Sequence, residues 1–378
     1  MAIVWHLLTG EYPPGRGGVG DYTAALAGAL AAEGDEVHVW TPSAAATGAP
    51  GVSVHALPDA FGGASRTALA RALRDRPGVM LLQYVPNALG QRGANLPFCL
   101  WWRRLGRTAP DLRVMFHEPY FYFTWTRPWT PGNALALVQR IMARLLARGS
   151  RRVYQSTETW RRYLPGADRL PSLETLPIPS NVPCASTADA AEFRIRAGIG
   201  DAPLVGHFGT FGAHVAQELR AILPSLVARR PDVRVALVGD GGPAFVEDLR
   251  RVHPGVARCV FATGRLDAPA VAAALRACDV LLQPYPDGIT TRRTSVMAGL
   301  ANGVATVTTA GALTERVWTE TGAVALAPAG DTSAFVEAID RLLSDSQARA
   351  ALGVRAAAVY AERFSMRHTI AILRGPAS

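Results

Sequence analysis

The chain of 378 residues contains no lysine, so all 39 of its basic residues are arginines. We find no basic block interleaved with aromatic residues, and the arginines are scattered, which argues against nucleic acid as a partner despite the net charge of +9. The charge fits an enzyme with an anionic substrate and one that works near anionic lipid equally well. Peripheral membrane association therefore stays open.

Cysteine is also scarce, with four residues that lie far apart, at positions 99, 184, 259 and 278. They form no CxxC pair, and no Cys/His spacing is typical of zinc. We interpret them as buried free thiols in a reducing compartment, and we expect a cytoplasmic protein without a metal site.

No run of 18 uninterrupted apolar residues occurs, so no membrane-spanning helix is expected. The apolar run at the N-terminus is too short for a signal peptide and lacks a basic start, so it reads as a core strand. Hydrophobic residues make up 49% of the chain and charged residues 18%, which is typical of a globular protein. The length predicts two domains.

Short apolar segments alternate with helix-compatible segments along both halves of the sequence. In the first half we expect strands at 3–8, 36–41, 79–83 and 113–117, and in the second half at 204–208, 233–238, 279–284 and 304–308. The proline-rich segment 177–183 is the best boundary between the halves. The sequence therefore predicts an α/β protein with two Rossmann-like parallel-sheet domains around a central cleft.

The most informative loop follows the predicted strand at 279–284. It contains a turn at Asp287 and Gly288 and then the hydroxyl- and arginine-rich run 290–295, which leads into a helix. A helix N-terminus favours an anion, and Arg292 and Arg293 can add charge-assisted hydrogen bonds to phosphate oxygens. The loop predicts a phosphate or diphosphate site; the alternative is a surface loop with two solvated arginines.

A second glycine-rich loop, with Gly17, Gly18 and Gly20, follows the first predicted strand. Its spacing is not GxGxxG, and Trp40-Thr41-Pro42 ends the next strand where a dinucleotide site needs an acidic residue. The sequence therefore argues against a nicotinamide site, and we interpret these glycines as allowing the backbone to approach a ligand closely.

The order of the motifs resembles retaining glycosyltransferase family 4, whose members have the GT-B fold. The motifs are the glycine-rich loop, a histidine at the end of a middle strand (His117), GTFG at 209–212, TGRL at 263–266, the helix entry MAGLANGVATVTT, and GALTE at 311–315. The loop PYPDGITTRRTS is similar to that of a bacterial subgroup linked to polysaccharide or secondary-metabolite glycosylation.

The resemblance implies that a sugar moves from a nucleoside-diphosphate sugar, with UDP preferred, to a hydroxyl acceptor with retention and without a metal or resident cofactor. The implied catalytic residues are His117, Arg292 and Arg293. The implied donor-binding residues are Gly18, Gly209, Thr210, Arg265, Leu266, Asp287, Gly288, Thr290, Thr291 and Glu315. The residues that we assign to the acceptor are Asp21, Tyr22, Tyr84 and Glu118.

The resemblance also implies a division of labour along the chain. Residues 1–180 would bind the acceptor, 181–355 the nucleotide sugar, and 356–378 would form a helix that crosses back to the first domain. The sequence departs from the family at four positions. Asp287 and Ser295 stand where two glutamates are common, and Thr210 and His214 stand where an arginine and a lysine usually neutralise the diphosphate, so Arg292 and Arg293 are the obvious substitutes.

Two other functions stay open on sequence grounds. One is a different enzyme on the same fold, such as a sugar-nucleotide epimerase or a pseudo-glycosidic coupling enzyme. The other is a catalytically silent nucleotide-sugar-binding protein, which the missing second glutamate would suit. The aromatic segment 119–129 reads as a packed lid, with a membrane-facing patch as the alternative.

Overall fold

A computed structural model describes residues 2–15, 17–43, 46–109, 111–121, 123, 129–164, 166, 170 and 172–375. The chain forms two compact units. Unit 1 comprises Met1–Pro177 together with Thr369–Ser378, and unit 2 comprises Ile178–His368. The first division falls within three residues of the expected boundary at 180, whereas the expected C-terminal segment 356–378 is shared between the units, because 356–368 belongs to unit 2.

Unit 1 is built on a parallel sheet with the strand order β3-β2-β1-β4-β5-β6-β7. Its strands are β1 (Val4–Thr9), β2 (Glu36–Thr41), β3 (Val52–Ala56), β4 (Val79–Tyr84), β5 (Leu112–Phe116), β6 (Arg152–Gln155) and β7 (Leu173–Thr175). Its helices are α1 (Gly18–Ala32), α2 (Gly63–Asp75), α3 (Leu96–Leu105) and α4 (Pro131–Gly149), with short 3₁₀ turns η1 (Pro86–Leu89), η2 (Gln91–Gly93) and η3 (Glu158–Tyr163).

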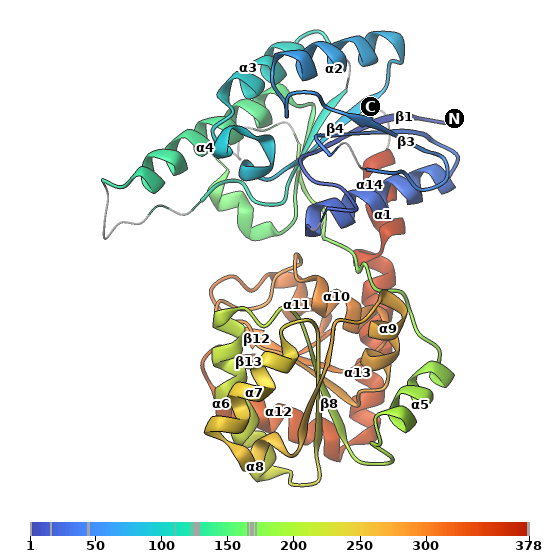
Figure 1. The fold of residues 1–378 in the computed structure, drawn as a ribbon, viewed down its shortest axis with the longest axis vertical. Coiled ribbons are helices and arrows are strands. Elements are labelled where there is room, and N and C mark those ends of the chain that lie inside the picture. The colour runs from blue at the N-terminus through green and yellow to red at the C-terminus, as the bar shows by residue number, and fades with distance from the viewer. Residues whose placement is uncertain are drawn as a thin grey trace. The chain divides into compact units, whose positions relative to one another are not determined.

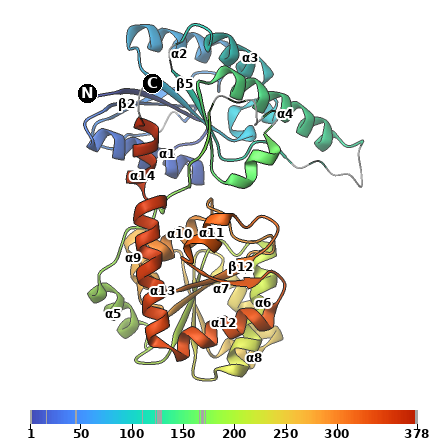
Figure 2. The ribbon, with the colours of Figure 1, turned by 180° about the vertical axis from the view of Figure 1, so that it is seen from behind.

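Helices cover both faces of this sheet, as the near-continuous apolar sequences of its strands require. Helices α2, α3 and α4 share one core with β4 and β5, while α1 and the end of α14 (Met366–Arg374) lie on the other face (Figures 1 and 2). The last turn of α14 is tied into unit 1 by polar contacts. Arg113 donates to the carbonyl of Leu373, and Arg374 contacts the buried carboxylate of Asp35 at 2.7 Å.

Unit 2 has its own parallel sheet, with the order β10-β9-β8-β11-β12-β13. The strands are β8 (Leu204–Phe208), β9 (Arg234–Val238), β10 (Val260–Gly264), β11 (Val280–Gln283), β12 (Thr306–Ala310) and β13 (Ala325–Pro328). The helices are α5 (Thr187–Arg196), α6 (Ala213–Arg229), α7 (Gly242–Val252), α8 (Pro254–Ala257), α9 (Ala268–Arg276), α10 (Thr294–Ala301), α11 (Arg316–Thr321), α12 (Thr332–Ser344) and α13 (Ser346–Val359), followed by a π turn, η5 (Tyr360–Phe364).

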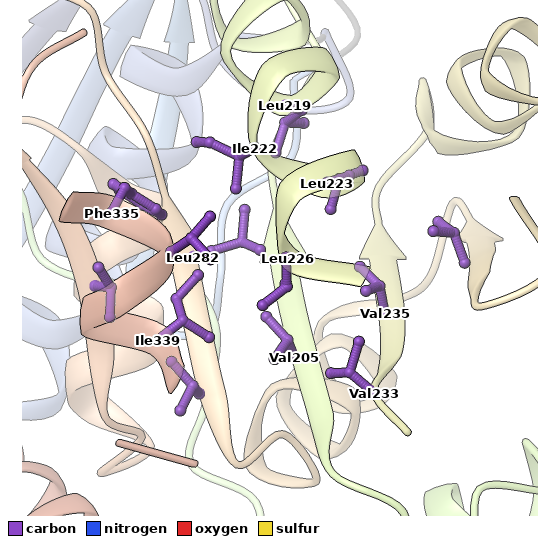
Figure 3. Packing of buried hydrophobic residues seen from close by; sticks show 14 of the residues in the cluster. Val205, Leu219, Ile222, Leu223, Leu226, Val233, Val235, Leu282, Phe335 and Ile339 are labelled. Carbon is purple, nitrogen blue, oxygen red and sulfur yellow. The ribbon is translucent and has the colours of Figure 1, made fainter. Parts of the chain in front are cut away.

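The larger core of unit 2 lies between β8, β11 and the helices α6 and α12 (Figure 3). Leu219, Ile222 and Leu226 of α6 recur at helical spacing, so one face of the helix enters this core. They pack over Val205 and Leu282, and all five side chains are at most 1% exposed. Burial of each side chain stabilises the unit by about 1.5–3 kcal/mol.

The two parallel sheets confirm the predicted α/β architecture with Rossmann-like domains. They also place the carboxyl ends of β8, β9, β10 and β11 along one edge of the unit 2 sheet. Loops at that edge are where open α/β sheets bind ligands, so the residues that follow these strands are the candidates for a binding site.

Candidate functional site

The loop between β11 and α10 opens with a tight turn that depends on Gly288. Its amide donates to the carbonyl of Tyr285 at 3.0 Å, and its φ of 92° lies in the left-handed region that favours glycine. A Cβ atom at this position would lie 2.5 Å from the amide nitrogen of Gly311, which leaves no room for a side chain. The turn sets the direction in which the arginine-rich part of the loop leaves the sheet.

The middle of this loop is held by Glu315, which is only 4% exposed. One carboxylate oxygen accepts a hydrogen bond from the hydroxyl of Thr291 at 2.9 Å, and the other accepts from the backbone amide of Thr291. The carbonyl of Thr291 in turn accepts from the amide of Ile178 at 3.2 Å. Glu315 therefore fixes the backbone that leads directly into Arg292 and Arg293.

Replacing Glu315 by glutamine is expected to loosen this loop. The side-chain NH₂ group of glutamine would face one of the two Thr291 donors, and two donors cannot form a hydrogen bond. One buried hydrogen bond is therefore lost, at a cost of about 1–3 kcal/mol. Urea unfolding should show the lower stability, and the affinity for a nucleoside diphosphate should fall about tenfold through loss of preorganisation. The exposed Glu320→Gln variant is the control; equal behaviour of the two variants would contradict the anchoring role.

Arg293 is oriented by an aromatic ring. Its guanidinium carbon lies 4.4 Å from the ring centroid of Tyr285, a cation–π geometry. The Tyr285 hydroxyl lies 2.8 Å from the hydroxyl of Ser295, and burial raises the pKa of Tyr285 above its ordinary value of 10.0. Arg293, Tyr285 and Ser295 thus form one packed group at the start of α10.

A cavity of about 880 Å³ lies at the carboxyl edge of the unit 2 sheet. Most of the residues that line it lie at or just after the ends of β8, β9, β10 and β11: Phe208, Gly209, Thr210, Phe211, Gly239, Asp240, Gly241, Arg265, Leu266, Gln283, Tyr285, Arg292, Arg293, Thr294 and Ser295. The lining combines glycines, hydroxyl side chains and arginines with the apolar Phe211 and Leu266, so it offers both polar and apolar contacts. The volume is that of a pocket for a small organic ligand.

His207, at the end of β8, also lines this cavity, although its sequence context gave no functional signal. Its Nδ1 atom lies 3.0 Å from the carbonyl of Leu282, so Nδ1 carries the proton and Nε2 is an acceptor. Burial lowers the pKa of His207 to about 4, and the ring is therefore neutral. The sequence could not reveal this role, because the contact with Leu282 depends on β8 and β11 being neighbours in the sheet.

His117 follows β5 in unit 1 and is buried as a neutral ring. Its Nε2 atom lies 2.8 Å from Oε1 of Gln83, which only accepts, so Nε2 carries the proton and Nδ1 does not. Burial lowers the pKa of His117 to about 3. The Tyr22 ring meets it edge to face at a centroid distance of 5.1 Å, so Tyr22 and His117 are in contact.

The glycine-rich loop of unit 1 holds an unexpected carboxylate. Oε1 of Glu11 accepts from the backbone amides of Val19 at 3.0 Å and Gly20 at 3.2 Å, and so caps the N-terminus of α1. Gly18 is exposed, with open space around it. Burial and the charge of Glu11 raise the pKa of Asp21 above its ordinary value. Sequence reasoning missed Glu11, whose position two residues after a strand was the only available signal.

The structure brings six of the predicted residues of unit 2 to the cavity and leaves five outside its lining. Gly209, Thr210, Arg265, Leu266, Arg292 and Arg293 line it. Asp287 is exposed and lies outside the lining; Thr290 and Thr291 are buried within the loop, Gly288 forms its opening turn, and Glu315 is buried against it. The physical reason is that the sharp loop that carries the arginines needs a tight turn and buried hydrogen bonds to hold its backbone, and the buried residues among these supply them.

The acceptor assignments in unit 1 need one correction. Tyr84 is fully buried in the core, where its ring packs edge-on against Phe116 at 5.1 Å, so it is a packing residue. Sequence reasoning placed it in a loop, whereas β4 extends by one residue to include it. Asp21 and Glu118 are exposed, and Tyr22 is buried beside His117.

Two further expectations concern metals and membranes. Within the described ranges, no three His, Cys, Asp or Glu side chains are grouped so that they could hold a metal ion. No helix among the described residues combines the length and apolar character that crossing a bilayer requires. The predicted lid at 119–129 falls largely on residues 122 and 124–128, which lie outside the described residues.

Two family models match this chain. A "Glycosyl transferase 4-like domain" matches residues 17–180, and "Glycosyl transferases group 1" matches residues 202–345. Together the matches span most of the chain, so domain models of glycosyltransferases match both units. The motifs that carried the resemblance lie within these matched segments.

Individual proteins show the same fold. Sucrose-phosphate synthase from Thermosynechococcus elongatus is 16% identical with a TM-score of 0.70, over 98% of this chain and 97% of that chain. HepE from Anabaena, in complex with UDP and glucose, is 16% identical with a TM-score of 0.68, over 98% of both chains. A phosphatidyl-myo-inositol mannosyltransferase from Mycolicibacterium smegmatis is 33% identical over 138 residues, which are 36% of this chain and 35% of that relative.

Proposed function

We propose that this protein is a retaining glycosyltransferase that moves a sugar from a nucleoside-diphosphate sugar, with UDP preferred, to a hydroxyl acceptor in polysaccharide or secondary-metabolite biosynthesis. The observation that carries the proposal is the cavity of unit 2. Arg292 and Arg293 enter it on a loop fixed by Glu315, beside the backbone of Gly209 and Thr210. Two guanidinium groups in one cavity suit a diphosphate, because each can donate charge-assisted hydrogen bonds to phosphate oxygens.

The chemistry requires stabilisation of the leaving group. As the bond between the anomeric carbon and the diphosphate oxygen breaks, negative charge grows on the diphosphate and positive charge on the sugar. In our proposal Arg292 and Arg293 stabilise the departing charge without a metal ion. The acceptor attacks from the same face, and the leaving phosphate takes its proton, which explains retention without a protein nucleophile.

His117 is a positioning or hydrogen-bonding group in this scheme, and not a general base at neutral pH. Its pKa of about 3 means that it cannot hold a proton taken from an acceptor hydroxyl. The unprotonated Nδ1 atom is an acceptor for a sugar hydroxyl, while Gln83 holds the ring in place. Asp21 and Glu118 are the exposed carboxylates of unit 1 that we assign to the acceptor.

The comparisons support the choice of nucleotide. HepE, which shares the fold, was solved with UDP and glucose and with UDP-glucose, and the mannosyltransferase relative transfers a sugar according to its name. One observation favours a second candidate, a catalytically silent nucleotide-sugar-binding protein. Ser295, which stands at the position of a common family glutamate, has its hydroxyl within 2.8 Å of Tyr285 and brings no charge to the cavity.

A thermal-shift panel of UDP, GDP, dTDP and their sugars tests the proposal. Because a ligand bound at 100 times its Kd stabilises the folded state by about 2.7 kcal/mol, UDP should raise the melting temperature by several degrees. Donor-dependent formation of a glycoside with the anomeric configuration of the donor, measured by NMR with EDTA present, establishes transfer. Nucleotide binding with no turnover on a broad acceptor pool would favour the silent binding protein, and absence of nucleotide binding would refute both.

A further inference from the structure

Two neighbouring helices of unit 1 expose large apolar side chains. Leu137 and Ile141 of α4 are 57% and 46% exposed, Leu100 of α3 is 43% exposed, and Trp129, just before α4, is 97% exposed. Helix α3 packs against α4, and Figure 1 shows the two helices side by side. We call the exposed residues Leu100, Arg104, Trp129, Leu137, Ile141, Arg144 and Arg148 the α3–α4 face.

The spacing of these residues places them on one side of each helix. In α4 the exposed positions 134, 137, 141, 144 and 148 alternate steps of three and four, which is the stripe of one helical face. Met142 and Leu146 lie on the opposite side and are fully buried in the core of unit 1. In α3, Leu100 and Arg104 are one turn apart. Other side chains therefore fill the core of unit 1, and the exposed apolar stripe takes no part in it.

The charge on this face has a single sign. Segments 77–110 and 119–157, which contain α3 and α4, hold ten arginines and no aspartate or glutamate, more than the +9 of the whole chain. Within the part of the chain that the structure describes, no carboxylate forms an ion pair with Arg104, Arg144 or Arg148. The arginines are scattered along the sequence, as expected. These two segments are strongly positive mainly because they lack aspartate and glutamate, and less because arginine is concentrated in them.

We propose that the α3–α4 face docks on an anionic lipid surface. A face that carries tryptophan and aliphatic side chains beside unpaired arginines matches the boundary between lipid headgroups and acyl chains. The apolar side chains enter the boundary, and the guanidinium groups bind lipid phosphates. A nucleic acid would bind the arginines but leave Leu137 and Ile141 exposed. An acidic protein would need an apolar patch that matches this one. An anionic membrane contacts both the apolar and the basic side chains without such a match. The proposal does not depend on sugar transfer.

Co-sedimentation with lipid vesicles tests the docking. The full chain is expected to bind vesicles made from equal parts of phosphatidylglycerol and phosphatidylcholine and not vesicles of phosphatidylcholine alone. Binding should weaken as ionic strength rises, because headgroup attraction is screened. The Leu137→Glu/Ile141→Glu variant should lose about tenfold or more in partitioning to the anionic vesicles, since charged side chains oppose insertion.

Matched variants separate this face from the rest of the surface. Ile195→Glu/Val354→Glu changes two apolar residues of unit 2 that are even more exposed, at 78% and 72%, and should bind like the unchanged protein. Arg144→Gln/Arg148→Gln should weaken binding, whereas Arg71→Gln/Arg74→Gln on α2 should not. Circular dichroism confirms that each variant is folded. Equal loss in both members of a pair, binding to neutral vesicles, or dimerisation through this face without vesicle binding would overturn the proposal.

Discussion

Changing Arg292 and Arg293 together to alanine is expected to lower kcat about 100- to 1,000-fold, with a smaller effect on the affinity for the donor. The reason is that the two guanidinium groups face charge that grows only as the diphosphate departs, and removal of one such group typically costs two to three orders of magnitude. Initial rates with a donor identified by the thermal-shift panel measure the effect.

The chain offers a close control for this variant. Arg250 and Arg251 of α7 are also adjacent, and they pair with Glu247 and Asp248 of their own helix. Their double alanine variant should keep normal turnover. Arg293→Lys is informative as well, because lysine retains the charge but loses the planar fork and the stacking on Tyr285. Unchanged turnover in the Arg292→Ala/Arg293→Ala variant would remove the arginines from the site.

Acid should destabilise both units below pH 6.5. The unfolded chain protonates His117 and His207 near 6.5, whereas burial lowers the pKa of the folded residues to about 3 and about 4. Between these values the unfolded state binds more protons, so stability falls as the pH falls. At about pH 5 each unit should have lost about 2 kcal/mol relative to pH 7.5. Urea unfolding at the two pH values measures the loss.

Single substitutions assign the acid effect to its source. His207→Gln should shrink the pH-dependent loss in unit 2 while leaving that of unit 1, because the glutamine side chain does not titrate. The exposed His214→Gln should leave the profile as it was. If unfolding at pH 5 and pH 7.5 requires the same urea concentration, the two histidines are not buried neutral in solution.

The fold was largely predictable because local patterns and topology agree. Segments such as 79–83 and 233–238 are mostly apolar runs between helix-compatible segments, and only buried parallel strands suit that alternation. Element ends were less predictable. Helix α1 begins at Gly18, within the glycine-rich loop, because Glu11 accepts hydrogen bonds from amides that would otherwise need a cap from the loop itself. A contact across eight residues leaves no local pattern.

The site shows the same division between what is local and what is not. Arg292 and Arg293 could be predicted because their charge and their position before a helix are both local features. The role of Glu315 could not be read correctly, since its partner Thr291 is 24 residues away and the bond becomes visible only in the fold. Gln83 and His207 were missed for a related reason: each gains its meaning from a residue on an adjacent strand.

The order in which the two units occupy the chain has a consequence for biosynthesis. Unit 2 is one continuous segment, Ile178–His368, whereas unit 1 is completed only by the residues from Thr369 onward. During synthesis unit 2 can therefore form all of its contacts while unit 1 still waits for the last turn of α14. Until Leu373 and Arg374 emerge, Arg113 and the buried Asp35 lack partners that they have in the finished protein. The domain whose strands are made first is therefore completed after the other domain.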